Sequence, residues 1–135
     1  GIEVILVSRT TFYDLKALKK LKAKVHIKSS CGPDEFLGFL KGAQYVITDS
    51  FHGSALSILM KKQFASVISP EKQNTNSRLV TLMQSTGLND RIIDTVDNAI
   101  FDRTINYGQV FEKLQPQINH SQKVLLKMSA DDRQG

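Results

Sequence analysis

The residues with the clearest chemical potential lie in the run Thr-Asp-Ser-Phe-His-Gly-Ser, residues 48–54. The run follows an apolar strand pattern and precedes an apolar helical pattern, so it leads from a strand into a helix. Free backbone N–H groups at a helix start attract anions, helped by the helix dipole. Ser50 and Ser54 add hydroxyl donors, and Gly53 lets a ligand approach the backbone closely. His52 adds a cation or a proton donor. The run therefore predicts a phosphate or carboxylate site.

A purely structural interpretation of the same run stays open. Asp49 or Ser50 can serve only as the N-cap of the helix, and Gly53 can be a glycine required by packing. On spacing alone, a histidine at a helix start does not decide between the two interpretations.

Two further cations follow the next predicted strand, Phe64–Ile68, in a polar stretch that contains Pro70. Because parallel strands end at the same edge of a sheet, this stretch should emerge beside His52. Lys72 would supply a point charge to a phosphate, and Arg78 would grip a phosphate or carboxylate with its planar fork. Each residue taken alone is also compatible with an ordinary surface position.

The remaining chemistry-bearing residues carry weaker signals. His26 in a short strand and His120 on the polar side of the last helix favour structural or surface roles, and Cys31 favours an ordinary loop position. The single cysteine excludes an internal disulfide and a cysteine-based metal cluster. No His, Asp or Glu cluster has metal-ligand spacing, so we expect no metal, and no nucleophile–base pair is readable from spacing.

Short apolar runs alternate with helical patterns along the chain. The expected strands are residues 2–7, 24–27, 45–48, 64–68 and 92–93, and the expected helices are residues 13–22, 33–40, 55–60, 78–86 and 107–128. The helix at 55–60 is nearly all apolar and should be the most buried. An apolar seam in the last helix recurs at steps of four and three residues, and Pro116 should bend this helix or reset its start.

Strands that alternate with helices predict an α/β fold, a Rossmann-like parallel sheet of about five strands with helices on both faces. We expect residues 1–135 to form a single Rossmann-like domain that ends in the long C-terminal helix. No G-x-G-x-x-G motif occurs, which argues against a nicotinamide or flavin enzyme, and no cofactor is expected.

Composition narrows the function classes further. The 135 residues are 41% hydrophobic and 23% charged, as in soluble globular proteins, and no apolar run is long enough for a transmembrane segment. The net charge of +5 arises within residues 1–30, which hold seven basic and two acidic side chains. No aromatic residue is interleaved from Lys16 to Lys28, so a solvated helix face is favoured over nucleic-acid binding. Attraction to anionic lipid or glycan stays open.

The run Gly-Pro-Asp-Glu-Phe-Leu-Gly at 32–38 and the run Ala-Gln-Tyr-Val-Ile-Thr-Asp-Ser-Phe-His-Gly-Ser-Ala-Leu-Ser-Ile at 43–58 resemble the polysaccharide pyruvyl transferase family. The likeness extends over residues 25–95 and includes Asn76-Ser77-Arg78 and Gly87-Leu88-Asn89-Asp90-Arg91. Members of this family resemble two-domain glycosyltransferases of the GT-B type. The resemblance implies that this chain is the C-terminal, donor-binding half of such an enzyme, with an N-terminal domain of the same protein as its partner.

The resemblance also implies an activity. Family members transfer a pyruvyl group from phosphoenolpyruvate to sugar hydroxyls of a surface polysaccharide or its lipid-linked precursor, which forms a ketal and releases phosphate. The family's S-F-H-G or R-L-H-G motif falls on Ser50, Phe51, His52 and Gly53. Its histidine, here His52, is linked to donor binding and catalysis, and a lysine after the following strand matches Lys72. Ser50 stands where some relatives carry an arginine.

This chemistry suits the residues present, because phosphoenolpyruvate carries a phosphate and a carboxylate. His52 would act as a general acid, a role that typically contributes 10²–10⁴-fold, or would contact the departing phosphate. The sequence does not choose between these roles. The resemblance places the protein in the cytoplasm as part of exopolysaccharide biosynthesis, with peripheral attachment to the inner face of the membrane as an alternative, and we expect no turnover from these 135 residues alone.

Two other classes of function stay open. The first is the donor-binding half of a GT-B nucleotide-sugar glycosyltransferase, which would hold a diphosphate at the same helix start. Such an enzyme should also present an acidic residue to the ribose, and Glu71 is the nearest candidate, in an unsuitable loop. The second is a non-catalytic α/β anion-binding module in which the S-F-H-G run only caps a helix.

Overall fold

In a computed structural model of the chain, residues 1–7, 23–68, 70–72 and 76–133 are described. The chain divides into two compact units, residues 1–43 and residues 44–135. The helix predicted at residues 13–22 lies outside the described residues. The expectation of a single domain over residues 1–135 stays a prediction.

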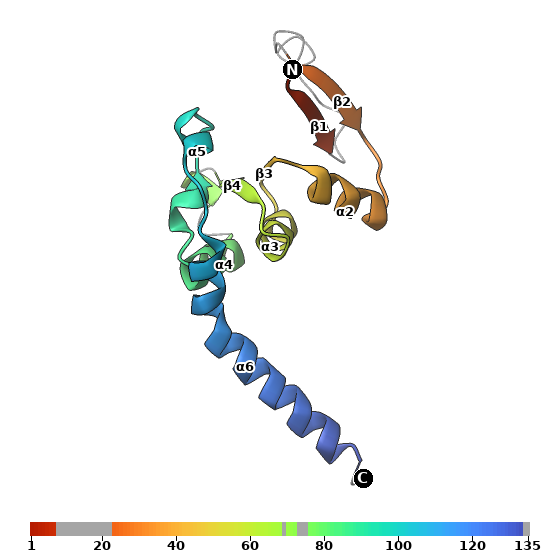
Figure 1. Cartoon of the computed structure of the whole chain (residues 1–135), viewed down its shortest axis with the longest axis vertical. Coiled ribbons are helices and arrows are strands. Elements are labelled where there is room, and N and C mark those ends of the chain that lie inside the picture. Colours follow the sequence, from red (N-terminus) through yellow and green to blue (C-terminus); the bar gives the residue numbers. More distant parts are fainter. Residues whose placement is uncertain (8–22, 69, 73–75, 134–135) are drawn as a thin grey trace. The chain divides into compact units, whose positions relative to one another are not determined.

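The described residues of the first unit form two parallel strands and one helix, which Figure 1 shows in red to orange. The strands are β1 (Glu3–Val7) and β2 (Lys24–Lys28), paired in register from Glu3 with Lys24 to Val7 with Lys28. Helix α2 (Pro33–Gly42) begins with Pro33 in its first turn, where a proline has no N–H to leave unpaired. Its predicted apolar stripe is present, with Leu40 buried and Phe36, Leu37 and Phe39 half-buried.

The second unit holds the remaining elements in alternating order. They are β3 (Tyr45–Thr48), α3 (Phe51–Leu59), β4 (Gln63–Val67), the 3-10 turn η1 (Pro70–Lys72), α4 (Ser77–Thr86), the 3-10 turn η2 (Asn89–Arg91), β5 (Ile92–Ile93), α5 (Ala99–Asp102) and α6 (Tyr107–Asp131). The strands pair in the parallel order β3-β4-β5. The mixed α/β class, the parallel pairing and the long C-terminal helix are thus confirmed.

The expectation of one continuous sheet is not met. Among the described residues, the strands pair as a two-stranded sheet, β1-β2, and a three-stranded sheet, β3-β4-β5. Apolar runs identify each strand, but pairing between strands depends on which backbones meet in space. Hydrophobic periodicity carries no information on that point.

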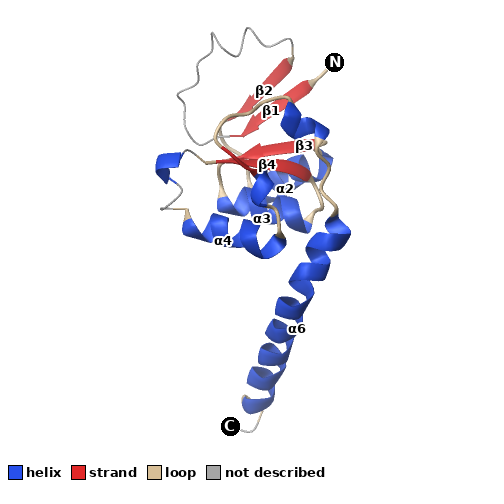
Figure 2. Ribbon diagram, turned by 90° about the vertical axis from the view of Figure 1, so that its left-hand side faces the viewer, coloured by secondary structure: helices blue, strands red, loops and turns tan. Residues whose placement is uncertain are grey.

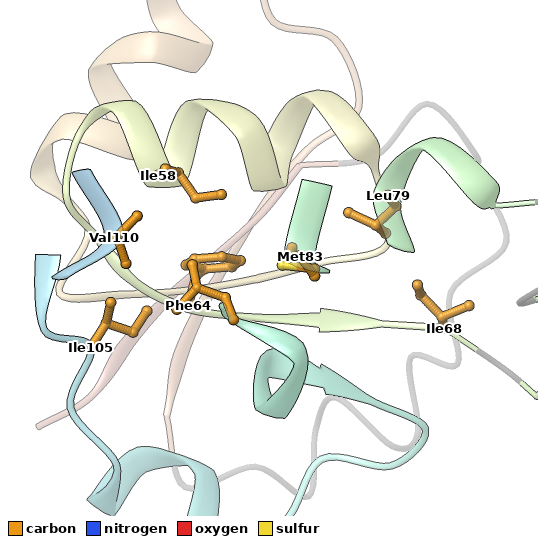
Figure 3. Close-up of a cluster of buried hydrophobic side chains, with 8 residues drawn as sticks. Ile58, Phe64, Ile68, Leu79, Met83, Ile105 and Val110 are labelled. Atoms are coloured by element: carbon orange, nitrogen blue, oxygen red, sulfur yellow. The ribbon is translucent and has the colours of Figure 1, made fainter. Parts of the chain in front are cut away.

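The core of the second unit lies on one face of the three-stranded sheet (Figure 3). Val46 and Phe64 are paired in register and point to this face, where α3 and α4 lie along the strands (Figure 2). The buried cluster consists of Ile58, Phe64, Ile68, Leu79, Met83, Leu88, Ile105 and Val110. Tyr45, one residue from Val46, points to the opposite face and contacts α5 through its ring, which lies 4.7 Å from that of Phe101. Helices therefore lie on both faces of this sheet.

Helix α3 differs from its prediction in two respects. It begins at Phe51, four residues earlier than the apolar run at 55–60 indicated, because Ser50 caps it. Its buried face is formed largely by small residues, Gly53, Ser54 and Ser57, together with Ile58, whereas Leu59 is 68% exposed. Small side chains bring the helix close to the sheet, and composition alone does not reveal which side of a helix they occupy.

The last helix, α6, continues through Pro116 instead of restarting there. The first part of the predicted seam packs on the core, where Val110 is buried and Tyr107 and Leu114 are partly buried. The seam then continues onto a part of α6 that extends beyond α4 (Figure 1), where Leu125 is 65% and Met128 is 60% exposed.

Candidate functional site

The candidate site is the N-terminus of α3, directly after strand β3. Ser50 has an extended backbone, with φ −106° and ψ 138°, and its Oγ accepts the N–H of Gly53 at 3.0 Å. The N–H of Ser50 donates to Thr48 Oγ1 at 3.1 Å, which ties the cap to the strand end. The structural interpretation of Ser50 as an N-cap is therefore correct, and it is compatible with a ligand site on the same turn.

Gly53 lies where the first turn of α3 touches the strand. A Cβ at this position would overlap the Thr48 hydroxyl and lie 3.1 Å from Thr48 Cβ. The glycine thus serves close helix–strand packing, as the structural interpretation of the sequence proposed. By letting the turn sit on the end of β3, it also places the helix N-terminus at the edge of the sheet.

Buried serines complete the attachment of α3 to the sheet. The Ser54 hydroxyl donates to the Ser50 carbonyl oxygen at 3.0 Å and lies 2.7 Å from the Ser66 hydroxyl of β4. Ser57 donates to the Gly53 carbonyl oxygen at 2.7 Å. All three side chains are fully buried, so in this structure the Ser54 hydroxyl faces the interior of the unit. Direct donation by Ser54 to a ligand stays a prediction.

Two backbone donors of the first turn remain free. The cap uses the N–H groups of Gly53 and Ser54, which donate to Ser50 Oγ and to the Ser50 carbonyl oxygen. Within the described part of the chain, the N–H groups of Phe51 and His52 have no acceptor. The first turn of α3 contains no acidic side chain, so nothing on the helix offsets the positive end of its dipole.

The side chains of Phe51, His52 and Arg78 form a contiguous group. Phe51 is half-buried against the core, and its ring meets the exposed His52 ring edge-on at 5.5 Å between centroids. The Arg78 guanidinium lies 5.4 Å from the Phe51 ring centroid, a cation–π distance. Arg78 comes from the first turn of α4, so the structure brings together residues 26 positions apart around one aromatic ring.

The local electrostatics favour an anion. Arg78 sits in the first turn of α4, which also lacks an acidic side chain. A cation at a helix N-terminus lies at the positive end of the dipole and gains nothing from it. The starts of α3 and α4 therefore add their positive potential at the group formed by Phe51, His52 and Arg78, which is the field a phosphate or carboxylate requires.

For Lys72, a predicted site residue, the structure describes only the backbone. Its backbone belongs to η1, which follows β4 at the same edge of the sheet as α3 begins. Its side chain lies outside the described part of the chain. A contact of Lys72 with a donor substrate stays a prediction.

Arg91 was not predicted to have a structural or binding role from the spacing of residues in the sequence. It is 2% exposed, and its Nη2 donates to the Arg103 carbonyl oxygen at 2.9 Å. Its Nη1 lies 3.5 Å from the Tyr45 hydroxyl, which donates to the Ile100 carbonyl oxygen. Burial raises the pKa of Tyr45, and the positive charge of Arg91 opposes that rise. The available signal was the charged run Asn-Asp-Arg directly before a strand, a pattern that is usually a solvated turn.

Groups for other functions are limited in the described ranges. No cluster of three or more His, Cys, Asp or Glu side chains in them could hold a metal ion. None of the described helices combines the length and the apolar character needed to cross a bilayer.

The fold and this site together define an α/β protein with a positively charged helix N-terminus at the carboxyl edge of a parallel sheet. Comparison with known families is more specific. The family model of polysaccharide pyruvyl transferase matches residues 4–71, just over half of the chain. The chain belongs to this family. The match includes Ser50–Ser54 and ends before Lys72 and Arg78. No curated protein and no solved structure matches the chain.

Proposed function

We propose that this chain binds phosphoenolpyruvate at the N-terminus of α3 and is the donor-binding half of a two-domain pyruvyl transferase. The acceptor in this proposal is a hydroxylated sugar of a polysaccharide or of its lipid-linked precursor. The observation that carries the proposal is the arrangement of His52 and Arg78 around Phe51, beside the two free N–H groups of α3. Membership in the pyruvyl transferase family supports the same donor.

The phosphate and the carboxylate of phosphoenolpyruvate suit the hydrogen-bond donors and cations of this site. The free N–H groups of Phe51 and His52 would bind phosphate oxygens, as helix N-termini do in many phosphate sites. The guanidinium of Arg78 would form paired hydrogen bonds with the carboxylate or the phosphate. Lys72, in the turn after β4, would add a further charge from the same edge of the sheet.

His52 is proposed to act at the reacting end of the donor. Ketal formation adds a proton to the methylene carbon of phosphoenolpyruvate and places positive charge on the neighbouring carbon. One sugar hydroxyl then bonds to that carbon and loses its proton. Phosphate leaves with the electron pair of its C–O bond and takes up a proton, and the second hydroxyl bonds in its place and releases its proton to solvent. His52, exposed on the first turn of α3, would supply the proton or neutralise the departing phosphate.

Titration of isotope-labelled chain with phosphoenolpyruvate, followed by NMR, tests the donor site. We expect shifts in the amides of Phe51 and His52 and in the Arg78 side chain. His52→Gln and Arg78→Gln should each weaken binding about tenfold, the usual cost of removing a hydrogen bond to a charged group.

Matched controls are His120→Gln and Lys123→Gln, which remove one histidine and one cationic side chain from the exposed part of α6. They should leave the affinity unchanged. UDP, titrated in parallel, should bind more weakly than phosphoenolpyruvate. Tighter binding of UDP would indicate that the site binds a nucleotide-sugar donor instead of phosphoenolpyruvate. If the control variants weaken phosphoenolpyruvate binding as much as His52→Gln and Arg78→Gln do, the affinity depends only on net charge.

A further inference from the structure

A polar cavity lies at the other end of α4 from Arg78. It is lined by the C-terminus of α4, the turn η2 and the start of α6, is open to solvent on one side and has a volume of about 180 Å³. Sites for drug-sized molecules are typically ~300–1,000 Å³, so this cavity suits a small ion. Helix α4 has ten residues, which places its two ends roughly 15 Å apart at 1.5 Å per residue. The cavity is therefore separate from the site at the N-terminus of α3.

Arg91 is one of the residues that line this cavity, and one of its nitrogens has no hydrogen-bond acceptor in the described part of the chain. Two of its nitrogens are engaged, by the Arg103 carbonyl oxygen and the Tyr45 hydroxyl, but its Nε is buried without an acceptor at hydrogen-bond distance in the described residues. The neighbouring carboxylate oxygen, Asp90 Oδ2, lies 3.6 Å away. A buried N–H without an acceptor is costly, and such groups in native proteins usually indicate a partner that the fold is built to receive.

Lys113 supplies the second positive charge. Its Nζ lies beside Gly87, the left-handed residue (φ 71°) that ends α4, and a Cβ at Gly87 would overlap this nitrogen. Among the described residues, no carboxylate lies within 4.0 Å of the Lys113 ammonium. The ammonium thus faces the negative end of the α4 dipole and the cavity, where its charge is not neutralised by an acid.

The balance of charges in the lining indicates the sign of the ligand. Lys113 and Arg91 are cationic, Asp90 is the one acid among the lining residues, and Asn106 and Gln109 add side-chain amides. The Asp90 side chain is 51% exposed and lies too far from Arg91 Nε for a hydrogen bond, so it can rotate into solvent at small cost. An oxyanion would then accept from Arg91 and Lys113 together.

We propose that this cavity binds a small oxyanion of the phosphate class between Lys113 and Arg91, with the Asp90 carboxylate displaced toward solvent. The site would hold phosphate independently of donor binding at α3. It lies against η2, whose Arg91 links β3 to the segment before α6, so occupancy would stabilise the packing of α6 on α4.

The test is an NMR titration of the full chain with inorganic phosphate at low ionic strength. We expect shifts in the amides of Gly87 and Asn106, at the cavity. Lys113→Gln should weaken this response about tenfold, because it removes a charge-assisted hydrogen bond. Asp90→Asn should strengthen it several-fold, because it removes the competing carboxylate. Lys123→Gln, elsewhere on α6, should leave it unchanged, and circular dichroism checks that each variant is folded.

The outcomes separate this inference from the proposed donor site. His52→Gln should weaken the phosphate-induced shifts at Phe51 about tenfold in affinity while leaving those at Gly87 intact. The inference is overturned if phosphate leaves Gly87 and Asn106 unshifted, or if Lys113→Gln and Lys123→Gln weaken the response equally. An equal response to acetate would assign the cavity to carboxylates and would overturn the phosphate assignment.

Discussion

Replacement of Gly53 by alanine tests the contact that seats α3 on the sheet. The added Cβ would overlap the Thr48 hydroxyl and lie 3.1 Å from Thr48 Cβ and 3.3 Å from Thr48 Cγ2. Thr48 cannot easily move, because its hydroxyl also accepts the N–H of Ser50. Gly53→Ala should therefore displace the first turn of α3, the same turn that carries the free N–H groups of the candidate site.

The expected magnitude follows from two opposing effects. Overpacking in a tight core typically costs ~1–3 kcal/mol. Alanine in place of glycine within a helix returns ~0.5–1 kcal/mol. The free energy of unfolding should therefore fall by about 1–2 kcal/mol, which corresponds to a decrease of about 4–7 °C in the melting temperature of a 135-residue chain.

Gly38→Ala is the matched control. Gly38 lies inside helix α2, and a Cβ there would have nothing within 4 Å. This variant should gain stability by ~0.5–1 kcal/mol, since only helix propensity changes. Urea and thermal unfolding, followed by circular dichroism, measure both variants.

The double variant Thr48→Ala with Gly53→Ala supplies the decisive comparison. It should be more stable than the sum of the two single effects predicts, because removal of the Thr48 side chain opens space for the new methyl group. If Gly53→Ala instead raises the stability as Gly38→Ala does, α3 does not lie as close to β3 as described. The anion site would then not lie where the structure puts it.

Three further perturbations follow from the same structure. Tyr107 donates to the carbonyl oxygens of Ser57 and Lys62, so Tyr107→Phe should lower the free energy of unfolding by about 1–2 kcal/mol in urea titrations. Burial raises the pKa of Tyr107 above its usual value of about 10. The neutral phenol therefore stabilises the fold fully below pH 10, and this contribution is lost as the pH rises further. The decline in the free energy of unfolding above pH 10 should be smaller in Tyr107→Phe, and an identical decline would contradict the raised pKa of Tyr107. Arg91→Gln should cost about 2–3 kcal/mol, because the Arg103 carbonyl oxygen and the Tyr45 hydroxyl lose a charged donor, and a loss below 0.5 kcal/mol would show that Arg91 does not hold η2 to β3. Leu125→Glu, on the exposed part of α6, should change stability by less than about 0.5 kcal/mol; a larger loss would mean that this part of the seam is covered in solution.

The local elements were largely predictable from the sequence. The apolar runs at 45–48 and 64–68 became β3 and β4 with boundaries shifted by one residue at most, because alternating and continuous apolar patterns reflect burial directly. Gly87 was predicted to end α4, and its left-handed backbone shows why only glycine is favourable there. The apolar run alone put the start of α3 too late, at residue 55, whereas the interpretation of Ser50 as an N-cap gave the observed start at Phe51.

The candidate site was predictable as a segment, and the position of Arg78 at the same edge of the sheet as His52 was also predicted, but the individual side-chain contacts were not. The residue types of 50–54 indicated a helix N-terminus, and their spacing along the chain was sufficient for that inference. The contact between Arg78 and Phe51 was not predictable, because it depends on how α4 packs beside α3. The inward direction of the Ser54 hydroxyl was likewise not predictable from the sequence. The buried face of a helix can be identified only when the elements packed against it are known.

The sequence by itself therefore determined the alternation of strands and helices, the family and the position of the S-F-H-G turn. These properties depend on residue order over short distances, where periodicity and capping act. The tertiary structure alone decided that the strands pair in two groups and that Gly53 is required by packing against Thr48. It also decided that Arg91, in an ordinary charged turn, is a buried cation. The strand pairing and the burial of Arg91 depend on contacts between distant segments, and the Gly53–Thr48 contact depends on how closely a helix lies on the end of a strand. Neither geometry exists before the chain packs.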